Sequence, residues 1–196
     1  MNTQQKKRLI IGITGASGAI YAIRLLEILR DIPSIETHLI ISQAAKQTIG
    51  AETQYVVQQV RALADVVYPS QDIGAAISSG SFRTMGMIVV PCSIKTLSGI
   101  AHSYTDDLIT RAADVCLKER KPLTLCVRET PLHLGHLRLL IQAAEIGAQI
   151  CPLMPAFYHQ PQSLDDMINQ SVVRLLDQFG IEFEQELFQR WGEKSK

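Results

Sequence analysis

Apolar residues along the chain occur in short continuous runs, and longer segments with helical spacing separate these runs. The continuous runs, which are typical of buried strands, cover residues 8–11, 38–41, 66–68, 86–91, 123–127 and 148–151. The segments with apolar residues at helical spacing cover 20–30, 43–49, 55–64, 105–121, 133–147 and 163–180. Strand and helix alternate from end to end, without internal repeats, linkers or low-complexity tracts. This alternation predicts one domain built on a parallel α/β sheet.

The first predicted strand leads into a glycine-rich turn with the sequence Gly-Ile-Thr-Gly-Ala-Ser-Gly-Ala at residues 12–19. Its backbone N–H groups and the start of the next helix favour a bound phosphate, and Ser17 adds a hydroxyl donor. The glycine spacing differs from the dinucleotide fingerprint, and the second strand ends in Ser42 instead of the acid that binds an NAD ribose. The turn therefore favours a mononucleotide. The alternative is a turn that serves only the packing of the helix on the strand.

Two further strands end in residues suited to anion binding or proton transfer. Residues 86–91 lead into 92–100, which we expect to be a hydroxyl-rich loop carrying Lys95. Residues 123–127 lead directly into Arg128 and Glu129. Arginine suits bidentate phosphate contact and glutamate suits proton transfer. Ligands of open α/β sheets collect at the carboxyl ends of strands, so these segments could face the same crevice as the glycine turn.

For several other charged or titratable residues, the sequence alone favours an explanation that involves no functional role. Glu52 interrupts a helical segment, where an acid at a helix start is usually solvated. Arg111 and Lys118 share one helix face, as in a solvated charge stripe. His133 and His136 could be two metal ligands, but no third ligand is evident and a catalytic zinc site needs three. We therefore expect no metal site.

Composition narrows the class of protein further. With 46% hydrophobic residues among 196, the chain can bury a full core. Nineteen basic residues balance nineteen acidic ones, which gives no electrostatic argument for nucleic acid. No apolar run is long enough to span a bilayer or to form a signal-peptide core. Four scattered cysteines without a Cys-x-x-Cys pair indicate buried reduced thiols and a cytoplasmic protein: Cys92, Cys116, Cys126 and Cys151.

Taken together and in order, five stretches of this sequence resemble the UbiX family of flavin prenyltransferases. They are residues 12–19, 91–93, 111–120, 128–132 and 155–159, which read GITGASGA, PCS, RAADVCLKER, RETPL and PAFYH. The resemblance extends from Leu9 to about Trp191. It implies a three-layer, flavodoxin-like or Rossmann-like fold, assembled as a dodecamer. We expect one flavoprotein domain over 1–196, with a flexible N-terminus at 1–7 and a C-terminal tail at 181–196 that packs on a neighbouring subunit.

The resemblance also implies an activity. The family joins the dimethylallyl group of dimethylallyl phosphate to N5 and C6 of reduced FMN, and a UbiD-type decarboxylase receives the prenylated FMN, as in ubiquinone biosynthesis. The Asp pairs at 106–107 and 165–166 do not complete the Asp-Asp-x-x-Asp cluster that holds magnesium in enzymes of prenyl diphosphates. We therefore expect a metal-independent enzyme. The alternatives are an FMN-dependent phenolic acid decarboxylase and a non-enzymatic FMN-binding module.

The resemblance implies roles for individual residues by matching position. FMN is held by Gly15, Ala16, Ser17, Ser42, Ser93, Ile94, Lys95, Thr96 and Arg128; the family varies at the position of Lys95. The prenyl phosphate is held by Lys118, Tyr158 and Arg174, with Arg111 nearby and Trp191 beside the allylic group. The catalytic residues are Ser17, Glu52, Lys118 and Glu129, of which the two glutamates handle protons.

Overall fold

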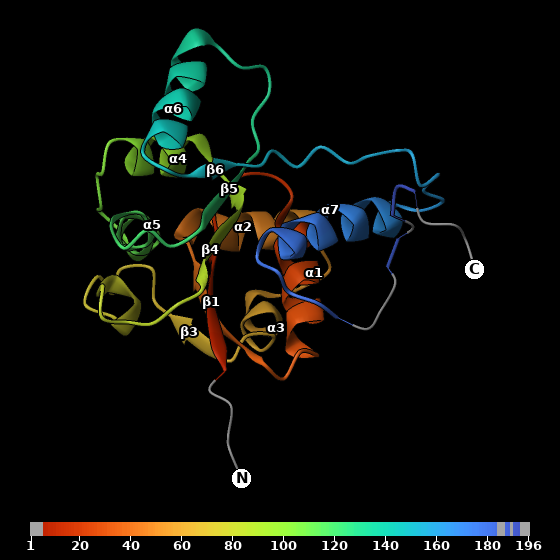
Figure 1. The fold of residues 1–196 in the computed structure, drawn as a ribbon, viewed down its shortest axis with the longest axis horizontal. Helices are drawn as coiled ribbons and strands as arrows, with labels where there is room; N and C mark the ends of the chain where they lie inside the picture. The colour runs from red at the N-terminus through yellow and green to blue at the C-terminus, as the bar shows by residue number, and fades with distance from the viewer. Residues whose placement is uncertain (1–5, 184–186, 189, 193–196) are drawn as a thin grey trace.

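The protein, described by a computed structural model at residues 6–183, 187, 188 and 190–192, is built on a parallel sheet (Figure 1). The sheet has six strands in the order β3–β2–β1–β4–β5–β6, and every neighbouring pair is parallel. The strands are β1 (Lys7–Ile13), β2 (Ile35–Ile41), β3 (Val66–Tyr68), β4 (Gly86–Cys92), β5 (Leu123–Val127) and β6 (Gln149–Ile150). The six predicted strands are thus confirmed, and β2 begins three residues earlier than expected.

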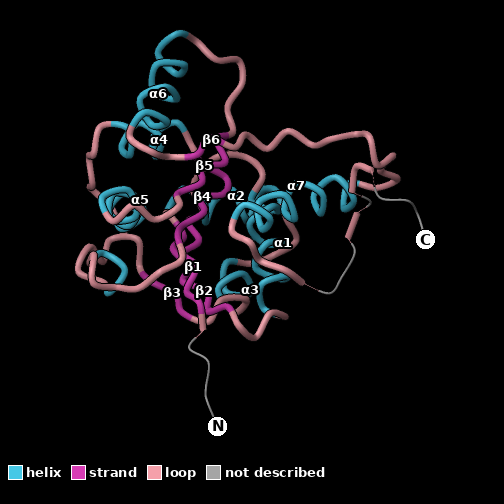
Figure 2. The backbone as a smooth tube through the Cα atoms, in the orientation of Figure 1, coloured by secondary structure: helices cyan, strands magenta, loops and turns pink. Residues whose placement is uncertain are grey.

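Helices cover both faces of the sheet, which confirms the three-layer architecture (Figure 2). One face carries α1 (Ala19–Arg30), α2 (Gln43–Glu52), α3 (Val57–Arg61) and α7 (Leu164–Gln178). The other carries α4 (Ile94–Ala101), α5 (Leu108–Lys118), α6 (Leu134–Glu145) and the 3-10 turn at Ala76–Ser78. Successive side chains of a strand point to opposite faces, so Ile11 packs beneath α1 whereas Ile10 packs on the other side.

The order of the strands fixes where a ligand can bind. From β1 the chain moves outward through β2 to β3, then returns to place β4 on the other side of β1. The direction of winding therefore reverses between β1 and β4. In open α/β sheets the crevice beyond the carboxyl ends of two such strands is the binding site.

Three boundaries differ from the prediction, each for a local reason. Residues 92–100 are not a loop, because the Ser93 hydroxyl caps α4 and its apolar residues Leu97 and Ile100 are buried at helical spacing. The next helix begins after Asp107, whose carboxylate accepts a hydrogen bond of 2.9 Å from the Thr110 amide. Lys7 does not belong to a flexible N-terminus, because it is the first residue of β1; residues 1–5 lie outside the described part.

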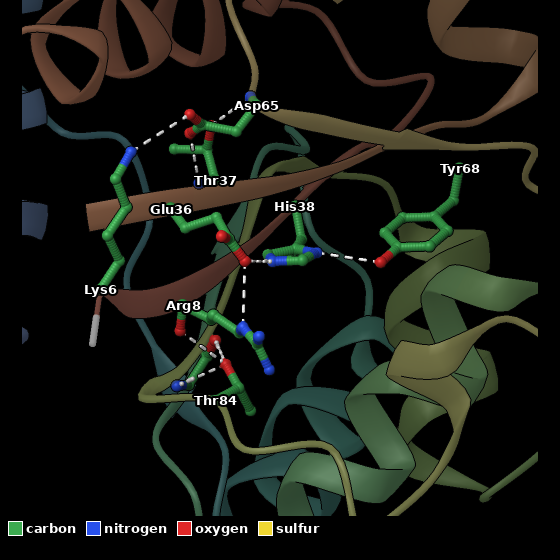
Figure 3. A network of polar contacts seen from close by, with 9 residues as sticks. Lys6, Arg8, Glu36, Thr37, His38, Asp65, Tyr68 and Thr84 are labelled. Atoms are coloured by element: carbon green, nitrogen blue, oxygen red, sulfur yellow. Dashed lines mark hydrogen bonds and ion pairs between the residues drawn. The ribbon is translucent and has the colours of Figure 1, made fainter. Parts of the chain in front are cut away.

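A buried polar network holds the amino-terminal half of β2 to its neighbours (Figure 3). The His38 ring lies 2.8 Å from the Glu36 carboxylate and 3.0 Å from the Tyr68 hydroxyl, and Arg8 donates to the same carboxylate at 3.0 Å. Burial lowers the pKa of His38, although its bond to Glu36 opposes this effect. The hydrogen bond from His38 lowers the pKa of Glu36. The network therefore joins β1, β2 and β3 with a histidine that is costly to protonate.

We expect this network to make the fold less stable as pH falls. The pKa of His38 is lower in the folded than in the unfolded chain, so the unfolded chain binds more protons below about pH 6.5. Replacing His38→Gln should therefore reduce the loss of melting temperature between pH 7.5 and pH 5.5. Tyr68→Phe is the control, because it removes a contact but keeps the imidazole and its pH dependence. An equal pH dependence in His38→Gln and wild type would contradict the assignment.

Candidate active site

Three helices begin at the carboxyl edge of adjacent strands, around the switch between β1 and β4. These are α1 after Gly18, α2 after Ser42 and α4 after Ser93. The hydroxyls of Ser42 and Ser93 accept the capping hydrogen bonds of their helices, from Ala45 at 3.1 Å and from Thr96 at 3.4 Å. Gly18 (φ 102°) caps α1 without a side chain. The N-termini of helices carry partial positive charge and unpaired N–H groups, so this edge favours an anion.

Thr14 connects the glycine turn to the end of β4. Its hydroxyl donates to the Pro91 carbonyl at 2.7 Å and accepts from the Ser93 amide at 2.8 Å. The side chain is buried, so these bonds are made away from water. Sequence reasoning missed this residue, although a polar side chain at the end of an apolar strand is a signal. The contact fixes the start of α4 relative to the glycine turn.

Gly15 allows the glycine turn to approach α2. A Cβ atom added at Gly15 would overlap the Cβ atom of Ala44, which lies in the first turn of α2. Gly15 therefore has a packing role, as the alternative for this turn proposed, although the contact it allows is with α2. The same closeness places Gly15, Ala16 and Ser17 beside Ser42, as the mononucleotide interpretation requires.

Glu52 contacts the glycine turn and lies at the end of a helix, not at a helix start. It is the last residue of α2, and its carboxylate accepts a hydrogen bond of 2.8 Å from the Gly18 amide. The implied site position of Glu52 is thus compatible with the structure; the expected place at a helix start is wrong, although the side chain is exposed. Its role in proton transfer stays a prediction.

Arg128 and Glu129 lie at the carboxyl end of β5. The Arg128 amide donates to the Cys92 carbonyl at 3.1 Å, which ties this segment to the end of β4. Burial raises the pKa of Tyr21 on α1, and the positive charge of Arg128 opposes this rise. The exposed Glu129 carboxylate accepts from the Thr130 amide at 3.0 Å. The two residues therefore border the crevice from its β5 side.

Lys95 directs its side chain away from the other flavin residues. Its side chain is 80% exposed, and its ammonium lies 3.8 Å from the Asp106 carboxylate. Both groups line an open cavity of about 550 Å³ between α4 and the start of α5. Only the backbone of Lys95, in the first turn of α4 with Ile94 and Thr96, remains near the crevice.

Tyr158, Arg174 and Trp191 form a separate cluster on α7 and the segments beside it. The rings of Tyr158 and Trp191 meet edge to face with centroids 5.5 Å apart. Arg174 pairs with Asp177 at 2.9 Å. The segment that follows β6 leads from the sheet to this cluster, and it passes the glycine turn, since Leu153 lies close to Gly18 (Figure 1). The two groups of predicted residues are thus joined by one segment.

Lys118 and Arg111 do not join either group within one chain. Lys118 ends α5, pairs with Glu119 at 2.6 Å, and lies five residues before the start of β5. Arg128 follows the other end of that strand, and five strand residues span about 17 Å. Lys118 therefore lies at the opposite edge of the sheet from Arg128. Arg111 pairs with Asp114 at 3.3 Å on the same helix as Lys118.

The four cysteines are free thiols but they are not equivalent. Cys92, Cys116 and Cys126 are buried, and burial raises the pKa of each. Cys151 is half-buried, and a hydrogen bond from the Cys126 thiol, supported by Gln178 and the charge of Arg174, lowers its pKa to about 6. The expectation of four buried thiols is therefore wrong for Cys151, which is only half-buried.

The two histidines considered as metal ligands have a structural role. The Nδ1 atom of His133 accepts from the amides of Gly135 and His136 and so caps α6. Within the described ranges, no group of three His, Cys, Asp or Glu side chains could hold a metal ion.

No helix in the part of the chain that the structure describes is long and apolar enough to cross a membrane.

Comparison with known proteins agrees with this geometry. The Flavoprotein family model matches residues 1–170. Flavin prenyltransferase UbiX of Escherichia coli K12 is 69% identical over 94% of this chain and 98% of its own length. The chain belongs to the UbiX family of flavin prenyltransferases.

Two solved structures support the same assignment. The crystal structure of AnUbiX (PadA1) in complex with FMN and dimethylallyl pyrophosphate has a TM-score of 0.93 and 48% identity, over 97% of this chain and all of that one. A dodecameric FMN-dependent UbiX-like decarboxylase from Escherichia coli O157:H7 has a TM-score of 0.90 and 49% identity, over 95% of this chain and all of that one. The flavodoxin-like fold expected from the resemblance is confirmed.

The packing of Gly15 on Ala44 gives a testable consequence. Gly15→Ala should displace the glycine turn from α2 and weaken FMN binding, with a stability loss of about 1–3 kcal/mol from overpacking. Adding Ala44→Gly removes the obstructing Cβ and should restore binding. FMN fluorescence titration and thermal unfolding measure the two effects.

Gly50→Ala is the matched control for this experiment, because a Cβ there meets no atom within 4 Å. It should leave FMN affinity unchanged. If Gly15→Ala binds FMN as the parent does, or if Ala44→Gly fails to rescue it, the contact does not control the site.

Proposed function

We propose that this protein is a flavin prenyltransferase, which transfers the dimethylallyl group of dimethylallyl phosphate to N5 and C6 of reduced FMN. The observation that carries the proposal is the carboxyl edge of β1 and β4, where three helices begin, a glycine packs closely on α2 and Arg128 follows the adjacent strand. Membership of the UbiX family supports the reaction. The related crystal structure with FMN and dimethylallyl pyrophosphate supports the two substrates.

The residues present fit the phosphate of FMN. We assign the contact to the backbone of Gly15, Ala16 and Ser17, with the hydroxyls of Ser17 and Ser42 beside it. On the β4 side, Ser93, Ile94 and Thr96 and the backbone of Lys95 offer the N-terminal turn of α4, and Arg128 adds a charge that suits bidentate contact. When bound, reduced FMN supplies the nucleophile and the phosphate of the allylic substrate is the leaving group.

The chain's own groups would stabilise the charge that develops on this phosphate. Arg174 and Tyr158 project from α7 and the segment before it, and they can donate to the departing oxygens. Trp191 offers a π face that can stabilise positive charge on the allylic carbon. Glu52 and Glu129 lie on opposite sides of the crevice, and we assign proton movement to them.

Lys118 can serve this phosphate only from a neighbouring subunit, since it lies at the opposite edge of the sheet in its own chain. Arg111 lies seven residues earlier, near the start of the same helix, so this argument does not extend to it. We therefore infer a homo-oligomer whose sites form between subunits, and the dodecameric relative supports this assembly. Helix α6 supports it as well, because Leu134, Leu137 and Ile141 on it are 43–61% exposed.

The product's recipient and the location in the cell follow from the same assignment. Prenylated FMN is the product, and we infer that a UbiD-type decarboxylase consumes it. Free thiols are typical of reducing compartments, which supports a cytoplasmic protein. The relative named a decarboxylase keeps direct decarboxylation of a phenolic acid as the alternative, and a non-enzymatic FMN-binding module is the other.

The activity can be tested directly. Incubation of the protein with reduced FMN and dimethylallyl phosphate should add one C5H8 unit to the flavin, as measured by mass spectrometry. The reaction should proceed in excess EDTA, because basic side chains supply the charge and the described residues lack a cluster of metal ligands. The same reaction with dimethylallyl diphosphate, run with and without magnesium, serves as the comparison for the monophosphate substrate. An unmodified flavin together with decarboxylation of a phenolic acid would support the alternative, and abolition by EDTA would contradict metal independence.

Two variants separate the flavin group from the phosphate group. Tyr158→Phe and Arg174→Ala should keep FMN bound but slow prenyl transfer roughly a hundredfold, the cost of losing one contact to a developing anion. Arg61→Ala, at an exposed arginine of α3, is the control and should change neither property. A variant that transfers at the parent rate would remove that residue from the phosphate site. Loss of FMN would place it in the flavin group instead.

A further inference from the structure

Asp177 on α7 is bound by two arginines that come from different parts of the chain. Arg174, one helical turn earlier, donates to Oδ2 at 2.9 Å. Arg190, in the C-terminal segment, donates to Oδ2 and Oδ1 at 2.8 Å each, which is bidentate geometry. The Asp177 side chain is 22% exposed, and hydrogen bonds from Arg190 lower its pKa.

The C-terminal segment that carries Arg190 lies against the segment that carries Tyr158. The Arg190 guanidinium lies 5.6 Å from the centre of the Phe188 ring, and Phe188 meets His159 at 5.9 Å. The next residue, Trp191, meets Tyr158. Exposed edge-to-face ring contacts contribute little orientation, since Trp191 remains 81% exposed. A bidentate arginine–carboxylate pair is directional, so Asp177 fixes where this segment attaches to α7.

We propose that Asp177 is a positioning residue of the prenyl phosphate site, which orients Arg174 and at the same time holds Trp191 beside Tyr158. The proposal rests on the proposed function, in which these three residues meet the allylic phosphate. Through one carboxylate, the guanidinium on the helix and the indole on the C-terminal segment take fixed positions before the substrate arrives.

The alternative is an ordinary ion pair that serves local stability. Pairs three residues apart on an exposed helix contribute little, and many contribute nothing measurable. The second arginine, thirteen residues further along the chain, distinguishes Asp177 from such a pair. A positioning role predicts effects on substrate binding and on Trp191 that a local role does not.

Asp177→Asn tests the proposal because it keeps the shape of the side chain and removes its charge. Asp165→Asn, at an exposed acid in the first turn of α7, is the matched control. Trp191 is the single tryptophan of the chain, so the anisotropy of tryptophan fluorescence reports the attachment of the C-terminal segment. In the FMN-loaded protein, Asp177→Asn should lower this anisotropy and raise KM for dimethylallyl phosphate about tenfold, with FMN content unchanged.

Arg190→Gln provides a second variant in case Asp177→Asn does not fold. It leaves the Arg174–Asp177 pair in place, so it should lower the anisotropy with a smaller rise in KM. Asp177→Glu, which restores the charge, should recover part of the lost affinity. The proposal is overturned if KM in Asp177→Asn stays within about twofold of the control, or if the anisotropy does not change. Failure of the wild-type protein to prenylate FMN would overturn the proposed function instead, while the anisotropy still tests the attachment.

Discussion

The contact of Thr14 with both Pro91 and Ser93 holds the two halves of the carboxyl edge together. Because the winding reverses between β1 and β4, no covalent connection joins their ends directly, and the loops that leave them could separate. The buried hydroxyl of Thr14, at the end of β1, donates to Pro91 and accepts from Ser93 at the end of β4, and these two bonds remove this freedom. The N-termini of α1 and α4 then lie at a fixed separation, and an anion can meet both without reorganisation, which is the condition for electrostatic preorganisation.

The fold was predictable because its signals are local. Buried parallel strands are continuous apolar runs, and the N-caps Ser42 and Ser163 mark helix starts where the structure has them. The errors occurred where tertiary contacts decide. Residues 92–100 contain enough hydroxyls to resemble a loop, but the burial of Leu97 and Ile100 makes the segment a helix. The start of α5 moved for a local reason, since Asp107 caps the helix in place of Thr105 or Asp106.

The sequence predicted the flavin-binding residues of the candidate site better than the contacts between residues that are distant in the chain. The flavin group follows strand ends, which the chain order reveals, and Gly15, Ser42, Ser93 and Arg128 lie where that reasoning puts them. Pairings between distant residues carry no such signal. The residues alone gave Glu52 and Lys118 no function, and only the resemblance placed them in the site. No pattern indicated that Arg190 reaches Asp177, or that Cys126 and Arg174 change the thiol of Cys151.

If Lys118 serves the prenyl phosphate, as we propose, one chain cannot contain the whole site. A helix that returns antiparallel to the strands must end at their amino-terminal edge, so the last residue of α5 is always far from the carboxyl edge of its own sheet. A lysine there can approach a phosphate at the carboxyl edge only across a subunit boundary. The apolar face of α6 and the C-terminal segment on α7 lie outside the compact sheet layers, where a neighbour can contact them. Assembly and catalysis would then depend on the same surfaces, and a change that weakens one should weaken the other.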